Sequence, residues 1–207
     1  MAMTLLTDND NEINKMTVKV LNRLSGSAPN IVILDAIHES YRKICEETEA
    51  WILNTVQTVS AENCLYDATG GYEINIRRVI SVKLRKKGQT TPFERIYPVE
   101  PQFYELKQNG IYFYDPNRIK IFDEGVIEII SAITPTRANE YIDEEMYEKY
   151  ANAIIYGAIA ELSSQLNRPW YSEQMFSFYN TKFNEELTHI MADASSKNKT
   201  VSEDFSG

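Results

Sequence analysis

The residue types that most often perform chemistry in proteins are sparse in this sequence. Its 207 residues include two histidines, His38 and His189, and two cysteines, Cys45 and Cys64. The histidines fall in different predicted helices, and neither has a cysteine or carboxylate at a spacing typical of metal ligands. The cysteines form no CxxC pair, which favours free buried thiols over a disulfide. These residues indicate no metal site, and we expect no cofactor.

Two short motifs could in principle serve an enzyme. The stretch YIDEEMYEK, residues 141–149, carries four acids that could pair for general acid and base catalysis. The acids stand at the predicted start of a helix, where they complement the helix dipole, and we favour this structural interpretation. The stretch DATGGY lacks the glycine spacing of a phosphate-binding loop and predicts a turn into a strand. No catalytic residue is therefore assigned, and we expect a protein that is not an enzyme.

A basic cluster is the most informative charge feature. Between positions 77 and 95, seven Lys and Arg residues stand beside one acid, whereas the rest of the chain holds 14 bases and 29 acids. This segregation predicts an electrostatic interface with an acidic neighbouring subunit or with nucleic acid phosphates; a solvated strand face is the alternative. The candidate interface residues, including three near the C-terminus, are Arg77, Arg78, Lys83, Arg85, Lys86, Lys87, Arg95, Lys197, Lys199 and Phe205.

The overall composition limits the possible partners. The net charge of -9 and the isoelectric point near 4.9 oppose a general affinity for nucleic acid or anionic membranes. No stretch approaches eighteen consecutive apolar residues, and the first twelve residues do not resemble a signal peptide. We therefore expect no membrane association and a protein made and kept in a cytosol-like compartment.

The apolar spacing predicts helices at both ends of the chain. A short helix over 12–24 looks like an appendage, and a long one over 31–54 carries an apolar stripe from Leu34 to Trp51. A helix from Asp143 has a stripe from Met146 to Leu166, with small residues that let another helix approach closely. Pro169 suits the first turn of the next helix, whose ring-rich stripe from Phe176 to Ile190 should fold back on the small residues.

A different period marks the middle of the chain. Ile80, Val82 and Leu84 alternate with Ser81, Lys83 and Arg85, which predicts a half-buried strand with a solvated basic face. Two runs around the turn residues 115–117 predict paired strands, and GVIEIISAI after Gly125 predicts another. Weaker strands are expected at 54–58, 72–76 and 94–99.

The predicted fold is therefore α+β. An antiparallel helical bundle is formed by residues 1–53 and 135–192, and an antiparallel β-sheet or small sandwich is inserted at 54–134. The segment 193–207 has no apolar period, and we expect a flexible C-terminal tail that docks on a partner.

Two stretches resemble the head-to-tail adaptor, or connector, proteins of tailed bacteriophages, including the tail tubular protein A type. The first is LDAIHESYRKICEETEAWILNTVQTVSAENCLYDATGGYEI, a long helix followed by strands that lead into an inserted β region. The second is YANAIIYGAIAELSSQLNRPWYSEQMFSFYNTKFNEELTHIMADA, an Ala-rich helix, a Pro-Trp corner and an aromatic helix. The segment KKGQTTPFERIYPVEPQFYELKQNGIYFYD departs from the family pattern.

The resemblance implies a structural virion protein of the phage neck. Such subunits assemble as a ring, probably twelvefold, between the portal and the tail, and often anchor to the portal by a C-terminal tail. Their lumen extends the conduit for DNA ejection without binding DNA specifically. The implied partners are the portal and adjacent neck and tail proteins, and synthesis would take place in the bacterial host cytoplasm.

A second hypothesis is a nucleic-acid-binding module that uses the basic β region. Tyr97 or Tyr112 could stack on bases beside the cluster. The two hypotheses differ in a measurable property, since only the second predicts salt-sensitive binding to short DNA or RNA.

Overall fold

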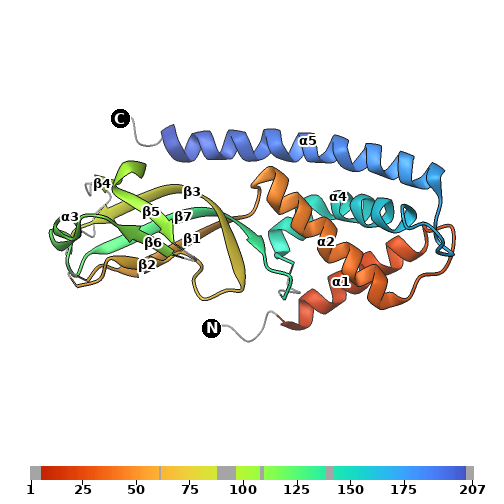
Figure 1. Cartoon of the computed structure of the whole chain (residues 1–207), viewed down its shortest axis with the longest axis horizontal. Helices are drawn as coiled ribbons and strands as arrows, with labels where there is room; N and C mark the ends of the chain where they lie inside the picture. Colours follow the sequence, from red (N-terminus) through yellow and green to blue (C-terminus); the bar gives the residue numbers. More distant parts are fainter. Residues whose placement is uncertain (1–5, 61, 88–96, 108–109, 139–141, 204–207) are drawn as a thin grey trace. The chain divides into compact units, whose positions relative to one another are not determined.

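The computed structural model describes residues 6–60, 62–87, 97–107, 110–138 and 142–203 (Figure 1). It contains helices and two antiparallel sheets, as the α+β prediction requires. Contacts divide the chain into two compact units. We call residues 1–50 with 137–194 the helical unit, and residues 51–136 with 195–207 the β unit. Residues 51–136 of the β unit are thus inserted between the two segments of the helical unit.

The helical unit contains α1 (Leu6–Leu21), α2 (Asn30–Thr48), α4 (Glu144–Ser163) and the first part of α5 (Glu173–Glu203). Helices α1, α2 and α4 pack against one another (Figure 1). Met16 and Val20 of α1 are fully buried, so the prediction that this helix is an appendage was wrong. Each helix buries one apolar stripe, which stabilises it more than its intrinsic propensity does.

Helix α2 ends six residues before its predicted end. Ile37, Tyr41, Ile44 and Thr48 are buried along the predicted stripe. Glu49 then adopts a left-handed conformation, with φ of 52°, and its N–H donates to the carbonyl of Cys45. This cap ends the helix, and the chain enters strand β1 at Ile52. The predicted helix over 31–54 was therefore too long.

Helix α4 follows its predicted stripe almost to the end. Asp143 is the N-cap, and its carboxylate accepts a hydrogen bond from the N–H of Met146 at 3.2 Å. Met146, Ala153 and Leu162 are buried, but Leu166 is 69% exposed because the helix ends at Ser163. The acids at this helix start therefore have the structural setting that the sequence analysis favoured.

The corner between α4 and α5 is closed by Trp170, as predicted. The indole N–H donates to Oε1 of Gln165 at 3.1 Å, and the backbone carbonyl accepts from Oγ of Ser25 at 3.3 Å. Pro169 lies outside both helices, so its predicted place in a first helical turn was wrong. Helix α5 begins at Glu173, where the hydroxyl of Ser172 accepts from the N–H of Met175 at 3.3 Å.

Helix α5 differs from its prediction in two respects. Phe183, Leu187 and Ile190 are buried, whereas Phe176 at the start of the predicted stripe is 37% exposed. The helix also continues to Glu203, so residues 193–203 are helical and the expectation of an irregular tail was wrong for them. Extending an existing helix costs less than starting one, which allows a segment without an apolar period to remain helical. Residues 204–207 lie outside the described part of the chain.

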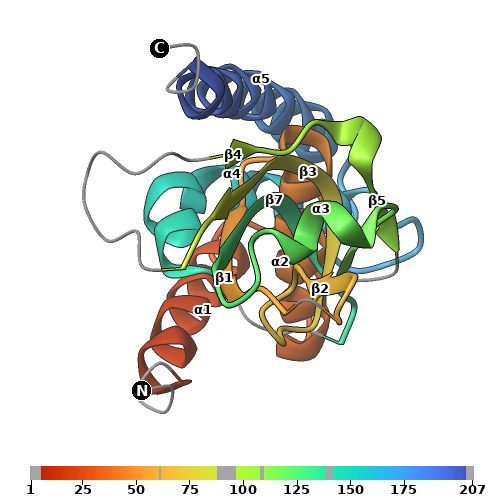
Figure 2. The same ribbon diagram turned by 90° about the vertical axis from the view of Figure 1, so that its left-hand side faces the viewer.

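The β unit contains two antiparallel sheets (Figure 2). The four-stranded sheet has the order β1 (Ile52–Thr58), β7 (Val126–Pro135), β3 (Ile74–Arg85) and β4 (Tyr97–Pro98). The three-stranded sheet has the order β2 (Leu65–Asp67), β6 (Gly110–Phe113) and β5 (Tyr104–Lys107). A short 3₁₀ helix, η1 (Pro101–Phe103), precedes β5, and α3 (Pro116–Lys120) follows β6.

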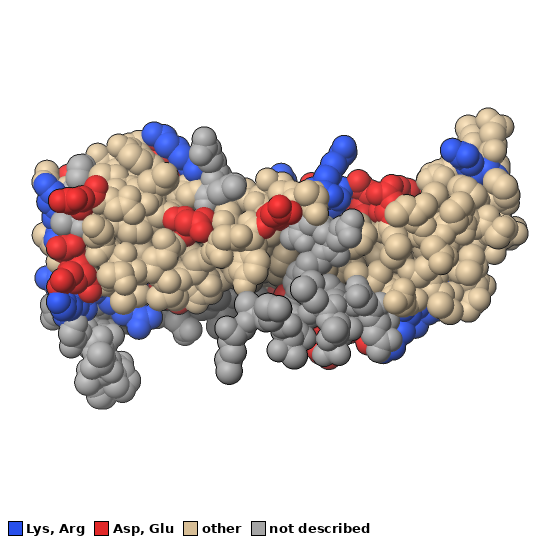
Figure 3. Space-filling model, turned by 90° about the horizontal axis from the view of Figure 1, so that it is seen from below, with Lys and Arg blue, Asp and Glu red and all other residues tan. Residues whose placement is uncertain are grey.

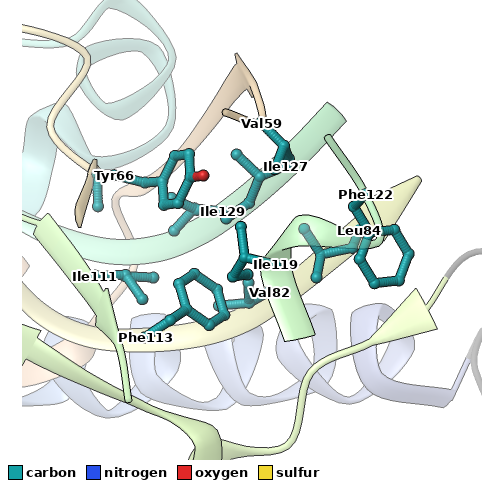
Figure 4. Close-up of a cluster of buried hydrophobic side chains, with 11 residues drawn as sticks. Val59, Tyr66, Val82, Leu84, Ile111, Phe113, Ile119, Phe122, Ile127 and Ile129 are labelled. Carbon is teal, nitrogen blue, oxygen red and sulfur yellow. The ribbon is translucent and has the colours of Figure 1, made fainter. Parts of the chain in front are cut away.

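One hydrophobic cluster joins the two sheets and α3 (Figure 4). Tyr66 and Phe113 of the smaller sheet meet edge to face, with ring centroids 5.9 Å apart. Strand β3 contributes Val82 and Leu84, as their alternation predicted. Ile80, the third residue of the predicted face, is not in the cluster, and the sheet register shifts between Val79 and Ser81. The other buried members are Val59, Ala68, Ile111, Ile119, Phe122, Ile127 and Ile129.

Helix α3 replaces one predicted strand. The run after residues 115–117 was predicted to pair with β6, but Pro116 starts a helix there. The carboxylate of Asp115 caps this helix by accepting from the N–H of Asn117 at 2.9 Å. The helix places Ile119 in the core. The strand predicted at 94–99 is the short β4, and residues 94–96 are not described.

Candidate interaction surface

The basic residues predicted to form an interface are spread along strand β3. Arg77 and Arg78 are exposed near its start, and Lys86 and Lys87 follow its end. Strand geometry separates the two pairs by about 25 Å, so they do not form one patch. Arg95 and Phe205 lie outside the described residues, and for Lys197 and Lys199 only the backbone in α5 is described.

Glu128 is the acid that the sequence analysis did not associate with this cluster. Lys83 on β3 is paired with Glu128 on β7 in the sheet register. Oε2 of Glu128 lies 3.8 Å from Nζ of Lys83 and 3.5 Å from Nη2 of Arg85. Its Oε1 accepts a hydrogen bond from Nδ2 of Asn54 on β1 at 2.8 Å. Side chains from β1 and β3 thus contact a single carboxylate on β7.

Burial of Lys83 contradicts the predicted solvated basic face. The residue is only 9% exposed, while Arg85 is half-buried. A charged side chain tolerates burial when a countercharge compensates for lost hydration, and Glu128 provides that charge. Lys83 is therefore part of the sheet structure, and it is a poor candidate for direct contact with a partner.

Lys86 and Lys87 remain accessible at the end of β3. Lys87 forms an exposed ion pair with Glu124, and Nζ of Lys86 lies 5.9 Å from the ring centroid of Tyr97. Exposed pairs contribute little free energy and exchange readily with other partners. We call Lys86 and Lys87 the β3 tip. On the face seen in Figure 3, acidic and basic side chains alternate at the end of the β unit instead of forming one basic surface.

An apolar pocket of about 340 Å³ lies beside this tip. Tyr97, Phe103 and Phe122 line it, and Tyr97 meets Phe122 edge to face at 5.1 Å. Ile121 at its border is 63% exposed. This pocket was not predicted, because its walls include residues of β3, β4, η1 and α3, and α3 was predicted as a strand. A basic tip beside an apolar pocket is a combination suited to protein contacts.

Neither tyrosine proposed for base stacking is isolated. The ring of Tyr97 is packed against Phe122, as described above, and Nζ of Lys107 lies 4.1 Å from the ring centroid of Tyr112. Tyr112 also meets Tyr114 edge to face at 6.3 Å. Stacking of a base on either ring would require these contacts to rearrange.

The remaining candidate groups do not come together. His38 lies on α2 and His189 on α5. Burial raises the pKa of the Cys45 thiol. Both cysteines are free, as predicted, and Cys45 is buried whereas Cys64 is half-buried. Within the described ranges, no group of three or more His, Cys, Asp and Glu residues could hold a metal ion. Among the same residues, no helix is long and apolar enough to cross a membrane.

Comparison with known proteins adds no assignment: neither a protein-family model nor a curated protein matches this chain.

Proposed function

We propose that this chain is a structural subunit of a phage neck, a head-to-tail adaptor that joins the portal to the tail. The observation that carries the proposal is the insertion of the β unit between the two segments of the helical unit. The resemblance noted in the sequence implies this same order, with an inserted β region between a long helix and an Ala-rich helix. In this proposal the helical unit is an antiparallel bundle and the β unit is a small sandwich.

The proposed mechanism is assembly, without a chemical step. A subunit that carries different surfaces on its two units can make head-to-tail contacts, which close into a ring when the rotation permits. Lateral contacts of the β3 tip and adjacent pocket, together with a docking C-terminus, would hold about twelve copies between the portal and the tail. The net charge of -9 suits a lumen that DNA traverses without adhering.

Native mass spectrometry of the protein alone, and after mixing with the portal protein from the same genome, tests this function. The expected result is a complex in which a ring of about twelve copies is added to one portal ring. A chain that stays monomeric and ignores the portal would overturn the role as a portal-proximal adaptor. The control for nonspecific association is a portal protein altered at the surface proposed to contact the C-terminus of this chain.

A charge reversal measures the contribution of the β3 tip. Arg85→Glu, Lys86→Glu and Lys87→Glu together should weaken ring assembly, more at low salt than at high salt. Arg85 also contacts Glu128, so its reversal can affect folding as well as assembly. A second variant that carries only Lys86→Glu and Lys87→Glu leaves this contact intact and measures the effect on assembly alone. Unchanged assembly of both variants would remove these residues from the proposed interface.

A further inference from the structure

The apolar pocket beside the β3 tip reaches into the core of the β unit. Its lining includes Leu84, Phe113, Ile119 and Phe122, four members of the hydrophobic cluster that are each at most 6% exposed (Figure 4). Ile121 at the border is 63% exposed. Contact between water and an apolar pocket is unfavourable, so this lining favours an apolar occupant.

The size and the wall of the pocket suit one aromatic ring. Its volume of about 340 Å³ is near the lower limit for ligand pockets, and a helix about 10 Å wide is too large for it. Tyr97 and Phe122 meet edge to face in the wall, with ring centroids 5.1 Å apart. A third ring would extend this arrangement, because aromatic rings prefer edge-to-face or offset contacts. The pocket therefore favours a single aromatic side chain.

A lysine at the rim adds a charge preference. Nζ of Lys86 lies 5.9 Å from the ring centroid of Tyr97, which lines the pocket. Lys86 is exposed and makes no ion pair with another residue that the structure describes. The two acids of the lining, Glu100 and Asp115, already accept hydrogen bonds from neighbouring residues. The lysine therefore favours an occupant with an acid next to its aromatic ring.

The C-terminal segment of the chain has this combination of residues. Phe205 follows two acids, Glu203 and Asp204, and precedes two small residues, Ser206 and Gly207. Helix α5 ends at Glu203, so residues 204–207 follow the helix. Four extended residues span about 14 Å, which lets a ring enter a pocket while the helix stays outside it.

We propose that the apolar pocket of one copy of the chain binds the C-terminal segment 203–207 of a second copy. The ring of Phe205 occupies the pocket, and Glu203 or Asp204 pairs with Lys86. The contact joins two different surfaces, so it is heterologous and can be repeated around a ring. The inference rests on the proposed function, because it identifies the neighbouring subunit as the partner of the docking C-terminus. Each contact is small, and closure of the ring makes the set of contacts stronger than one alone.

Two substitutions remove opposite sides of the proposed contact. Phe205→Ala removes the ring and keeps the pocket, whereas Ile121→Glu places a charge at the border of the pocket and keeps the segment. Each variant alone should associate about tenfold more weakly than the unaltered protein. An equal mixture of the two should form dimers and nothing larger, because it contains one intact pocket for each intact segment. Sedimentation velocity over a concentration series, at about 50 mM salt, measures both effects.

A peptide of residues 198–207 measures the contact without self-association. Carrying a fluorophore at its N-terminus, it should bind saturably to the Phe205→Ala protein, whose own segment lacks the competing ring. A peptide with the same Phe205→Ala change, or a protein that also carries Ile121→Glu, should reduce the affinity by about tenfold or more. Lys86→Glu should weaken binding more at about 50 mM salt than at about 500 mM. Fluorescence anisotropy measures each affinity.

Val56→Glu is the matched control for Ile121→Glu. Val56 is 61% exposed on β1 and does not line the pocket. This variant should self-associate like the unaltered protein, and adding it to the Phe205→Ala protein should leave peptide binding unchanged. Because Val56, Lys86 and Ile121 are all exposed, circular dichroism should show folded proteins in every case.

Two results would overturn the contact itself. The first is a mixture of the Phe205→Ala and Ile121→Glu proteins without dimers, or peptide binding that Ile121→Glu leaves unchanged. The second is an unaltered protein that stays monomeric and excludes the peptide while the Phe205→Ala protein binds it, because the segment would then occupy the pocket of its own chain.

The portal separates this inference from the proposed function. Rings that form on the portal equally well in every variant would overturn the contact and leave the adaptor function standing. Mixed dimers of a protein that never joins the portal would support the contact and overturn the adaptor function.

Discussion

The ring of Phe183 on α5 packs against Gly157 on α4, at the point where α2 also contacts this glycine. A Cβ atom added to Gly157 would lie 2.9 Å from Cε2 of Phe183 and 2.1 Å from Oγ of Ser40. We expect Gly157→Ala to destabilise the protein by about 1 kcal/mol, because overpacking outweighs the better helix propensity of alanine. Urea unfolding followed by circular dichroism measures this change.

A second substitution isolates the cause of that destabilisation. Ser40→Ala removes the closest atom, so Gly157→Ala should cost less in the Ser40→Ala background than in the unaltered chain. Equal costs in both backgrounds would show that the hydroxyl does not limit the space at Gly157.

Removal of the Glu128 carboxylate should destabilise the β unit. Glu128→Ala deprives the buried Lys83 of a countercharge and also removes the acceptor for Asn54. We expect a loss of about 2 kcal/mol, since a buried charge then lacks this compensation. Glu124→Ala is the matched control, because its pair with Lys87 is exposed and should contribute less than about 1 kcal/mol. Similar losses in the two variants, measured by chemical unfolding, would contradict the proposed importance of burial.

The Glu161 carboxyl should make stability dependent on pH. Burial, reinforced by the negative charges of Glu39 and Asp35 and opposed by Lys43 and Arg42, raises the pKa of Glu161 to about 7. The folded chain then retains a proton that the unfolded chain releases between pH 4.5 and about 7. The Glu161 contribution to stability is thus fully present below this window and is lost as the pH rises through it.

Glu161→Gln should remove this part of the pH dependence. The variant should be more stable than the unaltered chain at pH 8, by on the order of 1 kcal/mol after allowance for the partial exposure of the site. Thermal unfolding at pH 5, 6, 7 and 8 measures the slope, and Glu46→Gln in the same groove between α2, α4 and α5 is the exposed control. A slope that Glu161→Gln leaves unchanged would assign the pH dependence to other groups.

Specific nucleic acid binding is not expected from the basic strand. Lys83 and Arg85 are compensated by Glu128 and Lys87 by Glu124, and the net charge of the chain is -9. Fluorescence anisotropy with short single- and double-stranded DNA and RNA, at about 50 mM salt, should show no saturable binding. Salt-sensitive binding that is lost with Lys86→Glu and Lys87→Glu would instead support the nucleic-acid-binding hypothesis.

Apolar periodicity predicted the long elements well and the short ones poorly. The stripe of α2 and the apolar run of β7 depend on many residues, so one exception does not change the pattern. The wrong predictions fall at ends and turns. Glu49 ends α2 through a left-handed conformation that glutamate rarely adopts, and Pro116 starts a helix where a turn between strands was equally compatible with its sequence.

The candidate surface illustrates the same limit. Sequence proximity grouped Arg77 with Lys87, but an extended strand separates them, whereas Glu128 joined the cluster from a strand more than forty positions away. Local counts of charge cannot identify a cross-strand partner, because the sheet register determines which residues face one another.

The sequence by itself determined the mixed architecture, the insertion of a β region between helical segments and the apolar faces of the longest elements, because these follow from periods of 3.6 and 2 along the chain. The tertiary structure decided which charges are compensated and which surfaces remain available. It buried Lys83 beside Glu128, left Lys86 exposed, and placed Ser40 and Glu161 in one groove. Burial and electrostatic compensation depend on neighbours that are distant in sequence, and only packing brings those neighbours together.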